Sequence, residues 1–126
     1  MADTRKIRWL DEAEEKDYVA AQSYLSLLVA PDQLAGLIER LRSAPSGSWR
    51  AKDILRAARL PLLGVKQSEE VAEKLAKIAV KAALSPILLV VLPAEGALQI
   101  ADGYHRSCAA CLTHEDALVP GRILFA

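Results

Sequence analysis

The stretch SPILLVVLPAEGALQIADGYHRSCAA, residues 85–110, decides the fold that this sequence predicts. It opens with an apolar run from Pro86 to Pro93, which is too short to span a membrane and is bounded by prolines. Such a run is typical of a buried β-strand. Residues 94–96 (Ala-Glu-Gly) predict a turn and residues 97–101 a second short strand, so the two strands are expected to form a hairpin.

The chemically distinctive residues follow this hairpin, where the second strand ends and an alanine-rich helix is expected to begin near His105 or Arg106. They are Asp102, Gly103, Tyr104, His105, Arg106 and Ser107. Glycine lets the backbone approach a ligand closely, and the first N–H groups of a helix have no partner within the helix, so such a corner can bind an anion. Arg106 adds a planar fork of donors that suits phosphate or carboxylate. The residues alone therefore predict an anion-binding strand-turn-helix corner.

The segment ADGYHRSCAA, with PILLVV before it and VPGRIL after it, resembles the phosphate-binding segment of the ParB/sulfiredoxin-like fold. Sulfiredoxins carry Gly-Gly-Cys-His-Arg between a strand and a helix, ParB partition proteins carry Gly-x-x-Arg, and ParB-like free serine kinases carry Asp-Gly-His-Thr-Arg. The resemblance extends from about residue 51 to residue 126 and does not cover the first fifty residues. It implies a small α+β domain, a mixed sheet with helices packed on it, whose loop and helix N-terminus hold nucleotide phosphates. We expect the helices to pack on one side of the sheet.

Residue by residue, the resemblance supports a phosphate site and argues against one activity. Gly103, His105 and Arg106 match the sulfiredoxin motif, whereas Asp102, Gly103 and Arg106 match the serine-kinase motif. Tyr104 stands where sulfiredoxin has its catalytic cysteine, and a phenol cannot replace that thiolate, so sulfiredoxin chemistry is not expected. The resemblance implies binding of ATP or another nucleotide with Mg²⁺. It leaves open whether a kinase or NTPase reaction follows.

Each residue of the corner has a catalytic or binding interpretation and a structural one. Asp102 can accept a hydroxyl proton or bind Mg²⁺ beside phosphate oxygens, or it can stabilise the turn. His105 can donate to phosphate or act as a general acid or base, or it can bond to backbone. Arg106 can bind phosphate, or it can pair with Asp102. Ser107 is a candidate phosphate donor, and Tyr104 can stack on a ligand or simply pack.

Two further cations are candidates for the same site. Lys52 and Arg56 lie in a segment, residues 51–56, whose pattern fits either a strand or a short helix. In the family that the chain resembles, an arginine-bearing loop follows a strand near this point. A helix is then expected from Ser68, as its N-cap, to about Leu84. Its lysines share one face and are interpreted as solvated rather than as phosphate ligands; they are Lys74, Lys77 and Lys81.

The first 48 residues are expected to form a helical hairpin, followed by the α+β domain in residues 49–126, in one compact unit. A helical pattern starts at Asp11, and Pro31 ends this helix or begins the next. Residues 44–48 have the composition of a loop. The apolar stripe of the hairpin can pack on the domain, the favoured use, or form a dimer contact.

Cys108 and Cys111 form a Cys-x-x-Cys pair with three possible uses. They can be a redox pair, they can supply half of a zinc site with His105 and His114, or they can pack the helix against the sheet. A redox pair usually has its first cysteine at a helix N-terminus, whereas Cys108 is expected inside the helix. Packing is the favoured interpretation.

Composition narrows the classes of protein. A chain of 126 residues is long enough for one domain with a core, and its 52% apolar and 25% charged residues are ordinary for a folded protein. The formal net charge of zero argues against a nucleic-acid partner, as does the lack of a helix-turn-helix pattern. The charged first residues do not resemble a signal peptide, so we expect a cytoplasmic protein.

Three classes of function therefore stay open after the sequence is read. The first is a nucleotide-dependent catalyst. The second is a binding module that senses a nucleotide or another phosphate-bearing small molecule without chemistry. The third is an interaction protein that works through its helical hairpin.

Overall fold

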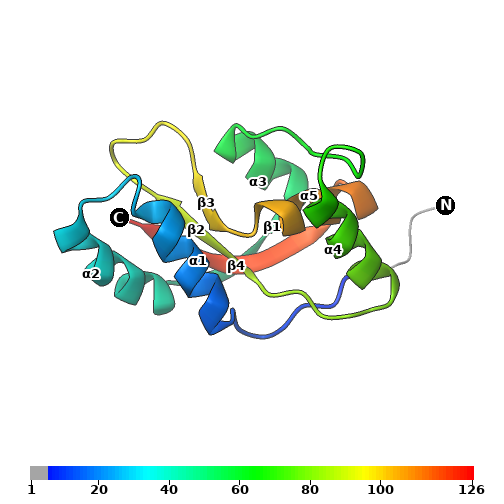
Figure 1. Cartoon of the computed structure of the whole chain (residues 1–126), viewed down its shortest axis with the longest axis horizontal. Coiled ribbons are helices and arrows are strands. Elements are labelled where there is room, and N and C mark those ends of the chain that lie inside the picture. Colours follow the sequence, from blue (N-terminus) through cyan, green and yellow to red (C-terminus); the bar gives the residue numbers. More distant parts are fainter. Residues whose placement is uncertain (1–5) are drawn as a thin grey trace.

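The computed structural model shows an α+β fold of five helices and a four-stranded mixed sheet over residues 6–126, the residues that the structure describes (Figure 1). The α+β class and the mixed sheet are thus confirmed. In chain order the elements are α1 (Glu15–Leu25), α2 (Pro31–Arg42), β1 (Ser46–Arg50), α3 (Ala51–Ala58), α4 (Glu69–Ala79), β2 (Ile87–Val91), β3 (Gln99–Asp102), α5 (Tyr104–Thr113) and β4 (Leu118–Phe125). Residues 1–5 of the expected N-terminal extension lie outside the described residues.

The sheet has the strand order β1-β4-β2-β3. The predicted hairpin is present as β2 and β3, which pair antiparallel with a register shift between Leu88 and Leu89. After α5 the chain returns as β4, which pairs parallel with β2 and antiparallel with β1. The apolar run thus lies in the interior of the sheet, between β3 and β4.

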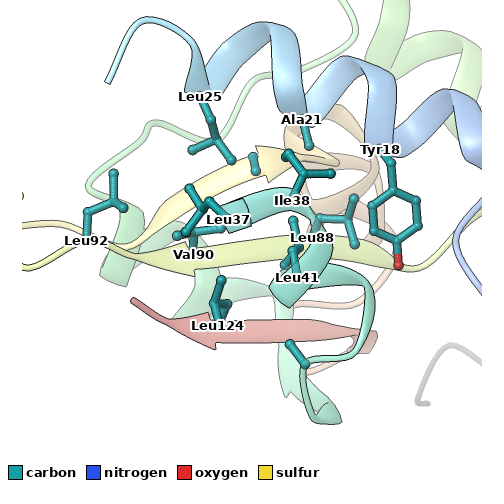
Figure 2. Packing of buried hydrophobic residues seen from close by; sticks show 12 residues of the cluster. Tyr18, Ala21, Leu25, Leu37, Ile38, Leu41, Leu88, Val90, Leu92 and Leu124 are labelled. Atoms are coloured by element: carbon teal, nitrogen blue, oxygen red, sulfur yellow. The ribbon is translucent and has the colours of Figure 1, made fainter. Parts of the chain in front are cut away.

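Helices cover both faces of the sheet, so the expectation that they pack on one side was wrong. Leu88 and Val90 of β2 face a cluster formed with α1 and α2, and Figure 2 shows the side chains of these two helices over β2 and β4. Ile87 and Leu89 face the opposite cluster, formed with α3 and α5. The physical reason is that β2 is apolar at successive positions, and such a strand must be buried on both sides.

The prediction of a loop at residues 44–48 was wrong, because residues 46–50 form β1. Their composition suits a loop, but β4 supplies a partner for each of these five residues. A Cβ on Gly47 would lie 2.9 Å from Cζ2 of Trp49, so the indole lies close over the glycine. Residues 51–56, which fitted either a strand or a helix, belong to α3.

Two predicted helices are shorter than expected. The first begins at Glu15 rather than Asp11, because Glu14 and Asp17 form a capping box there. The helix after Ser68 ends at Ala79 rather than about Leu84. Lys81 takes a left-handed conformation (φ 60°), and Leu84 exchanges backbone hydrogen bonds with Arg8 and Leu10 instead. No helix within residues 6–126 has both the length and the apolar character needed to cross a membrane.

Candidate functional site

The corner predicted from the sequence lies where β3 ends and α5 begins. Gly103 is the N-cap of α5 and has a φ of 115°, a conformation that residues with side chains rarely adopt. No side chain caps the start of this helix in the described part of the chain. Helix α5 begins at Tyr104, slightly earlier than expected, and its first N–H groups follow directly after the glycine.

Arg106 is buried and ties three parts of the fold together. Its Nη2 atom donates to Oδ2 of Asp102 at 2.7 Å and to the carbonyl oxygen of Pro86 at 3.3 Å. Its Nη1 atom lies 3.8 Å from Oδ1 of Asp17 on α1. Arg106 thus makes the structural pair with Asp102 that the sequence allowed, and it also lies beside a second carboxylate, that of Asp17.

The guanidinium of Arg106 is not fully satisfied by these contacts. Within residues 6–126, its Nε is a buried side-chain nitrogen with no hydrogen-bond partner. An unpaired buried donor costs about 1–3 kcal/mol, so such a group in a folded protein calls for an explanation. Arg106 is also one of the residues that line a pocket at the corner.

Asp17 was not predicted as a site residue, although its position on an apolar helix face could have indicated it. It lies on the same helical face as Ala21 and Leu25, four and eight residues later, which are fully buried. A carboxylate on an apolar face calls for a cationic partner. The side chain of Asp17 is only 5% exposed, and its Oδ2 atom also accepts the backbone N–H of Glu14 at 2.8 Å.

Two carboxylates therefore face one guanidinium. Burial raises the pKa of Asp102 above its ordinary value of 3.8, and the carboxylate of Asp17 raises it further. The charge and the hydrogen bond of Arg106 lower the pKa of Asp102, but these effects are outweighed. The cluster holds more negative charge than Arg106 alone can neutralise.

A pocket of about 200 Å³ opens beside the first turn of α5. Its lining residues are Glu70, Lys74, Asp102, Gly103, Tyr104, His105 and Arg106. Lys74 comes from α4, where it was expected on a solvated face, and its Nζ lies 3.2 Å from Oε1 of Glu73. Glu70 was not predicted at all; hydrogen bonds from its own backbone N–H and from the Ser68 hydroxyl lower its pKa. This pocket combines cations, carboxylates and helix N–H groups.

A second pocket of about 370 Å³ shares four lining residues with the first, Asp102 to His105. The pocket runs along edge strand β3, and residues from α1 and from the end of α3 also line it. Its lining residues are Tyr24, Ala58, Leu60, Leu98, Gln99, Ile100, Ala101, Asp102, Gly103, Tyr104 and His105. The hydroxyl of Tyr24 donates to Oε1 of Gln99 at 2.5 Å. The loop that carries residues 102–105 is thus exposed to two neighbouring pockets.

Tyr104 and Ser107 are held by hydrogen bonds within the protein. The Tyr104 hydroxyl donates to the carbonyl oxygen of Pro61 at 2.6 Å, and burial raises its pKa. The Tyr104 ring lies 5.4 Å from the ring of His105. Ser107 is fully buried and its hydroxyl donates to the carbonyl oxygen of Gly103 at 2.9 Å. Ser107 is therefore turned away from the pocket that Tyr104 and His105 line.

Lys52 and Arg56 lie away from the corner. The Nζ of Lys52 is 2.9 Å from Oδ1 of Asp116, beyond the C-terminal end of α5, and this contact raises the pKa of Lys52. The side chain of Arg56 is 80% exposed and pairs with Asp53 at 3.3 Å. Neither cation is among the described residues that line the two pockets. The structure thus brings together residues 102–106 but not these two.

The two cysteines contribute to packing. Cys108 is fully buried inside α5, Cys111 is partly buried, and both thiols are free. Burial raises the pKa of both, which is the opposite of what a redox thiol needs. Within residues 6–126, no group of three or more His, Cys, Asp or Glu side chains is arranged to hold a metal ion.

Comparisons with protein-family models, with curated protein sequences and with solved structures found no match to this chain.

Proposed function

We propose that this protein binds a phosphate-bearing small molecule, with a nucleotide as the favoured ligand, at the corner formed by residues 102–106. The observation that supports this most directly is the buried Nε of Arg106, which has no partner within residues 6–126 although Arg106 lines the pocket. An anionic oxygen is a strong acceptor for such a donor. A ligand that shifts the Arg106 side chain on binding would give this buried donor a partner.

The other groups around the 200 Å³ pocket suit the same class of ligand. The N-terminus of α5 favours negative charge and offers N–H donors that no side chain caps in the described residues. Lys74 and His105 add donors from two different helices. Glu70 and Asp102 bring carboxylates, and Mg²⁺ bound to phosphates typically uses one or two carboxylates in addition. In this proposal, Glu70 and Asp102 would contact Mg²⁺ carried by the phosphates.

A nucleotide is favoured because the second pocket adjoins the first. The 370 Å³ pocket offers room for a nucleoside beside Tyr24 and Gln99, while the phosphates lie at the corner. The resemblance to ParB/sulfiredoxin-like proteins supports the same ligand class, since their phosphate segment follows a hairpin and opens a helix. The chain has a hairpin, β2 and β3, directly before α5.

Turnover, by a kinase or NTPase reaction, is the further step of this proposal. Asp102 and His105 are the candidate catalytic residues. Asp102 and His105 both line the two pockets, but Asp102 is paired with Arg106 at 2.7 Å, so we expect His105 to be the better placed of the two to meet a ligand. Release of phosphate or transfer to an added acceptor is the measurement that separates turnover from binding.

The test is calorimetry with ATP, ADP, CTP and GTP, each with Mg²⁺, on wild type and on three variants. We expect His105→Ala and Lys74→Ala each to weaken binding about tenfold, the size of one charge-assisted contact. Lys77→Ala is the matched control, because Lys77 lies on the same helix and pairs with the same residue, Glu73, at 3.4 Å. No binding by folded wild type, or equal loss in all three variants, would contradict the proposal.

A second candidate function is supported by the surface of the N-terminal helices. Leu27, in the turn after α1, is 82% exposed, and Val19 on α1 is 61% exposed. Contiguous apolar surface is typical of contacts with another protein, and in this second proposal Val19 and Leu27 would contribute to such a surface. If the chain is an interaction module, a bound protein should be lost with Leu27→Asp and kept with Lys77→Ala.

A further inference from the structure

The excess negative charge beside Arg106 comes from a different part of the chain. Asp102 belongs to the corner itself, but Asp17 is brought to it by α1, some 85 residues earlier. Helix α1 packs on β3 through Ala21 and Leu25, which belong to the same core cluster as Ala101. The hydrogen bond from Tyr24 to Gln99 joins the same two elements. The place of Asp17 at the corner therefore depends on the docking of α1.

Asp17 occupies a position that disfavours a second anion. Its Oδ1 is 3.8 Å from Nη1 of Arg106, and its side chain is only 5% exposed, so water screens its charge weakly. Asp102 alone provides one negative charge for the one positive charge of Arg106. A phosphate that approaches Arg106 would meet the second carboxylate without compensation.

We propose that Asp17 makes helix α1 an internal competitor for Arg106, so that docking of α1 lowers the affinity of the corner for phosphate-bearing ligands. This inference rests on the proposed function and adds a regulation to it. Because coupling between two binding events is reciprocal, a ligand at the corner should also weaken the docking of α1. Anything that draws α1 away from β3 would then open the site.

The first experiment is calorimetry of Asp17→Asn with inorganic phosphate and with Mg-ATP. We expect affinity about tenfold higher than wild type, the order expected when one poorly screened charge is removed from a partly buried site. Glu15→Gln is the matched control, since Glu15 lies on the same helix and pairs with Arg42 at the surface. Unchanged or weaker binding by folded Asp17→Asn would overturn the inference.

The second experiment uses wild type and does not depend on the folding of a variant. Hydrogen exchange is followed with and without saturating Mg-ATP. We expect residues 104–107 to become more protected and residues 15–25 to exchange faster, as the reciprocal coupling requires. Protection at residues 104–107 with unchanged or slower exchange in α1 would overturn the inference.

The two proposals fail in different ways. If wild type binds neither phosphate nor Mg-ATP, if Asp17→Asn binds neither as well, and if residues 104–107 show no protection, the proposed function fails and the inference falls with it. If wild type binds, but Asp17→Asn binds no more tightly or exchange in α1 does not rise, the inference alone is wrong.

Discussion

Ile87 leaves no room for a side chain on Gly103: a Cβ at that glycine would lie 2.3 Å from Cγ2 and 2.7 Å from Cβ of Ile87. Ile87 is fully buried at the start of β2. Its parallel partner on β4, Gly121, is equally close, since a Cβ there would lie 2.5 Å from the Ile87 carbonyl oxygen. The start of α5 is thus placed by direct contact between a glycine and the central strand.

Gly103→Ala should therefore destabilise the protein by about 3 kcal/mol, as the left-handed backbone and the overpacking against Ile87 both add cost. The free energy of unfolding, measured by chemical denaturation, is the readout. A loss below about 0.5 kcal/mol, the range of an ordinary surface substitution, would show that the contact with Ile87 relaxes easily.

Gly36→Ala is the matched glycine substitution and should act in the opposite direction. Gly36 lies inside α2, and a Cβ there would meet no atom within 4 Å. We expect a gain of about 0.5–1 kcal/mol in the free energy of unfolding, because alanine lowers the entropy of the unfolded chain without a clash. A destabilised Gly36→Ala would contradict this prediction.

Arg106→Ala should destabilise the fold, and for this reason it is a poor test of ligand binding. Its removal leaves the carboxylates of Asp17 and Asp102 without their partner, and breaking a buried pair in this way costs about 3–5 kcal/mol. Denaturation with urea is the measurement. Arg56→Ala, which removes an exposed arginine paired at the surface, should change stability by less than about 0.5 kcal/mol. Similar values for the two variants would show that Arg106 carries no special structural role.

The carboxyl of Asp102 should titrate above its ordinary value of 3.8, because burial and the neighbouring Asp17 both raise its pKa. The carbon resonance of the carboxyl, followed by NMR against pH, reports this directly. In Asp17→Asn the midpoint should fall. Asp116 is the control: a hydrogen bond from Lys52 lowers its pKa, and Asp17→Asn should not change it.

The raised pKa of Asp102 has a defined effect on stability. The folded protein holds the proton of Asp102 more tightly than the unfolded chain does, so this contribution is fully present below about pH 3.8 and is lost as the pH rises through the folded-state value. Relative to Asp102→Asn, wild type should therefore lose stability as the pH rises through this range. The opposite slope would mean that the ion pair with Arg106 dominates the titration.

The thiols of Cys108 and Cys111 should react slowly with iodoacetamide at neutral pH, because burial raises the pKa of both. We expect Cys111 to react more than about tenfold more slowly than a free thiol, and the fully buried Cys108 to react only when the protein is unfolded. The double variant Cys108→Ser, Cys111→Ser should keep any ligand binding. Rapid alkylation of the folded protein would restore the redox interpretation.

Local pattern was enough to predict much of the fold. The apolar run of β2, the turn at residues 94–96 and the glycine before α5 predicted a strand, a hairpin and a helix at the places where they occur. The corner residues from Asp102 to His105 were also found this way, because residues adjacent in the sequence must lie close together in space. The short strand β1 was not found, since its residues become a strand only when β4 pairs with them.

The sequence by itself determined the α+β class, the β2–β3 hairpin and the corner, because these depend on hydrophobic periodicity and on turn residues a few positions apart. Only the tertiary structure decided which charges meet there. Lys52 pairs with Asp116 and Arg56 with Asp53, and neither cation is among the described residues that line the pocket at the corner. Helix α1 places Asp17 beside Arg106, and α4 places Glu70 and Lys74 at the pocket. The pairs Lys52–Asp116 and Arg106–Asp17 join residues far apart in the chain, and how the helices pack on the sheet sets them. Arg56, in contrast, pairs with Asp53 three residues earlier on the same helix.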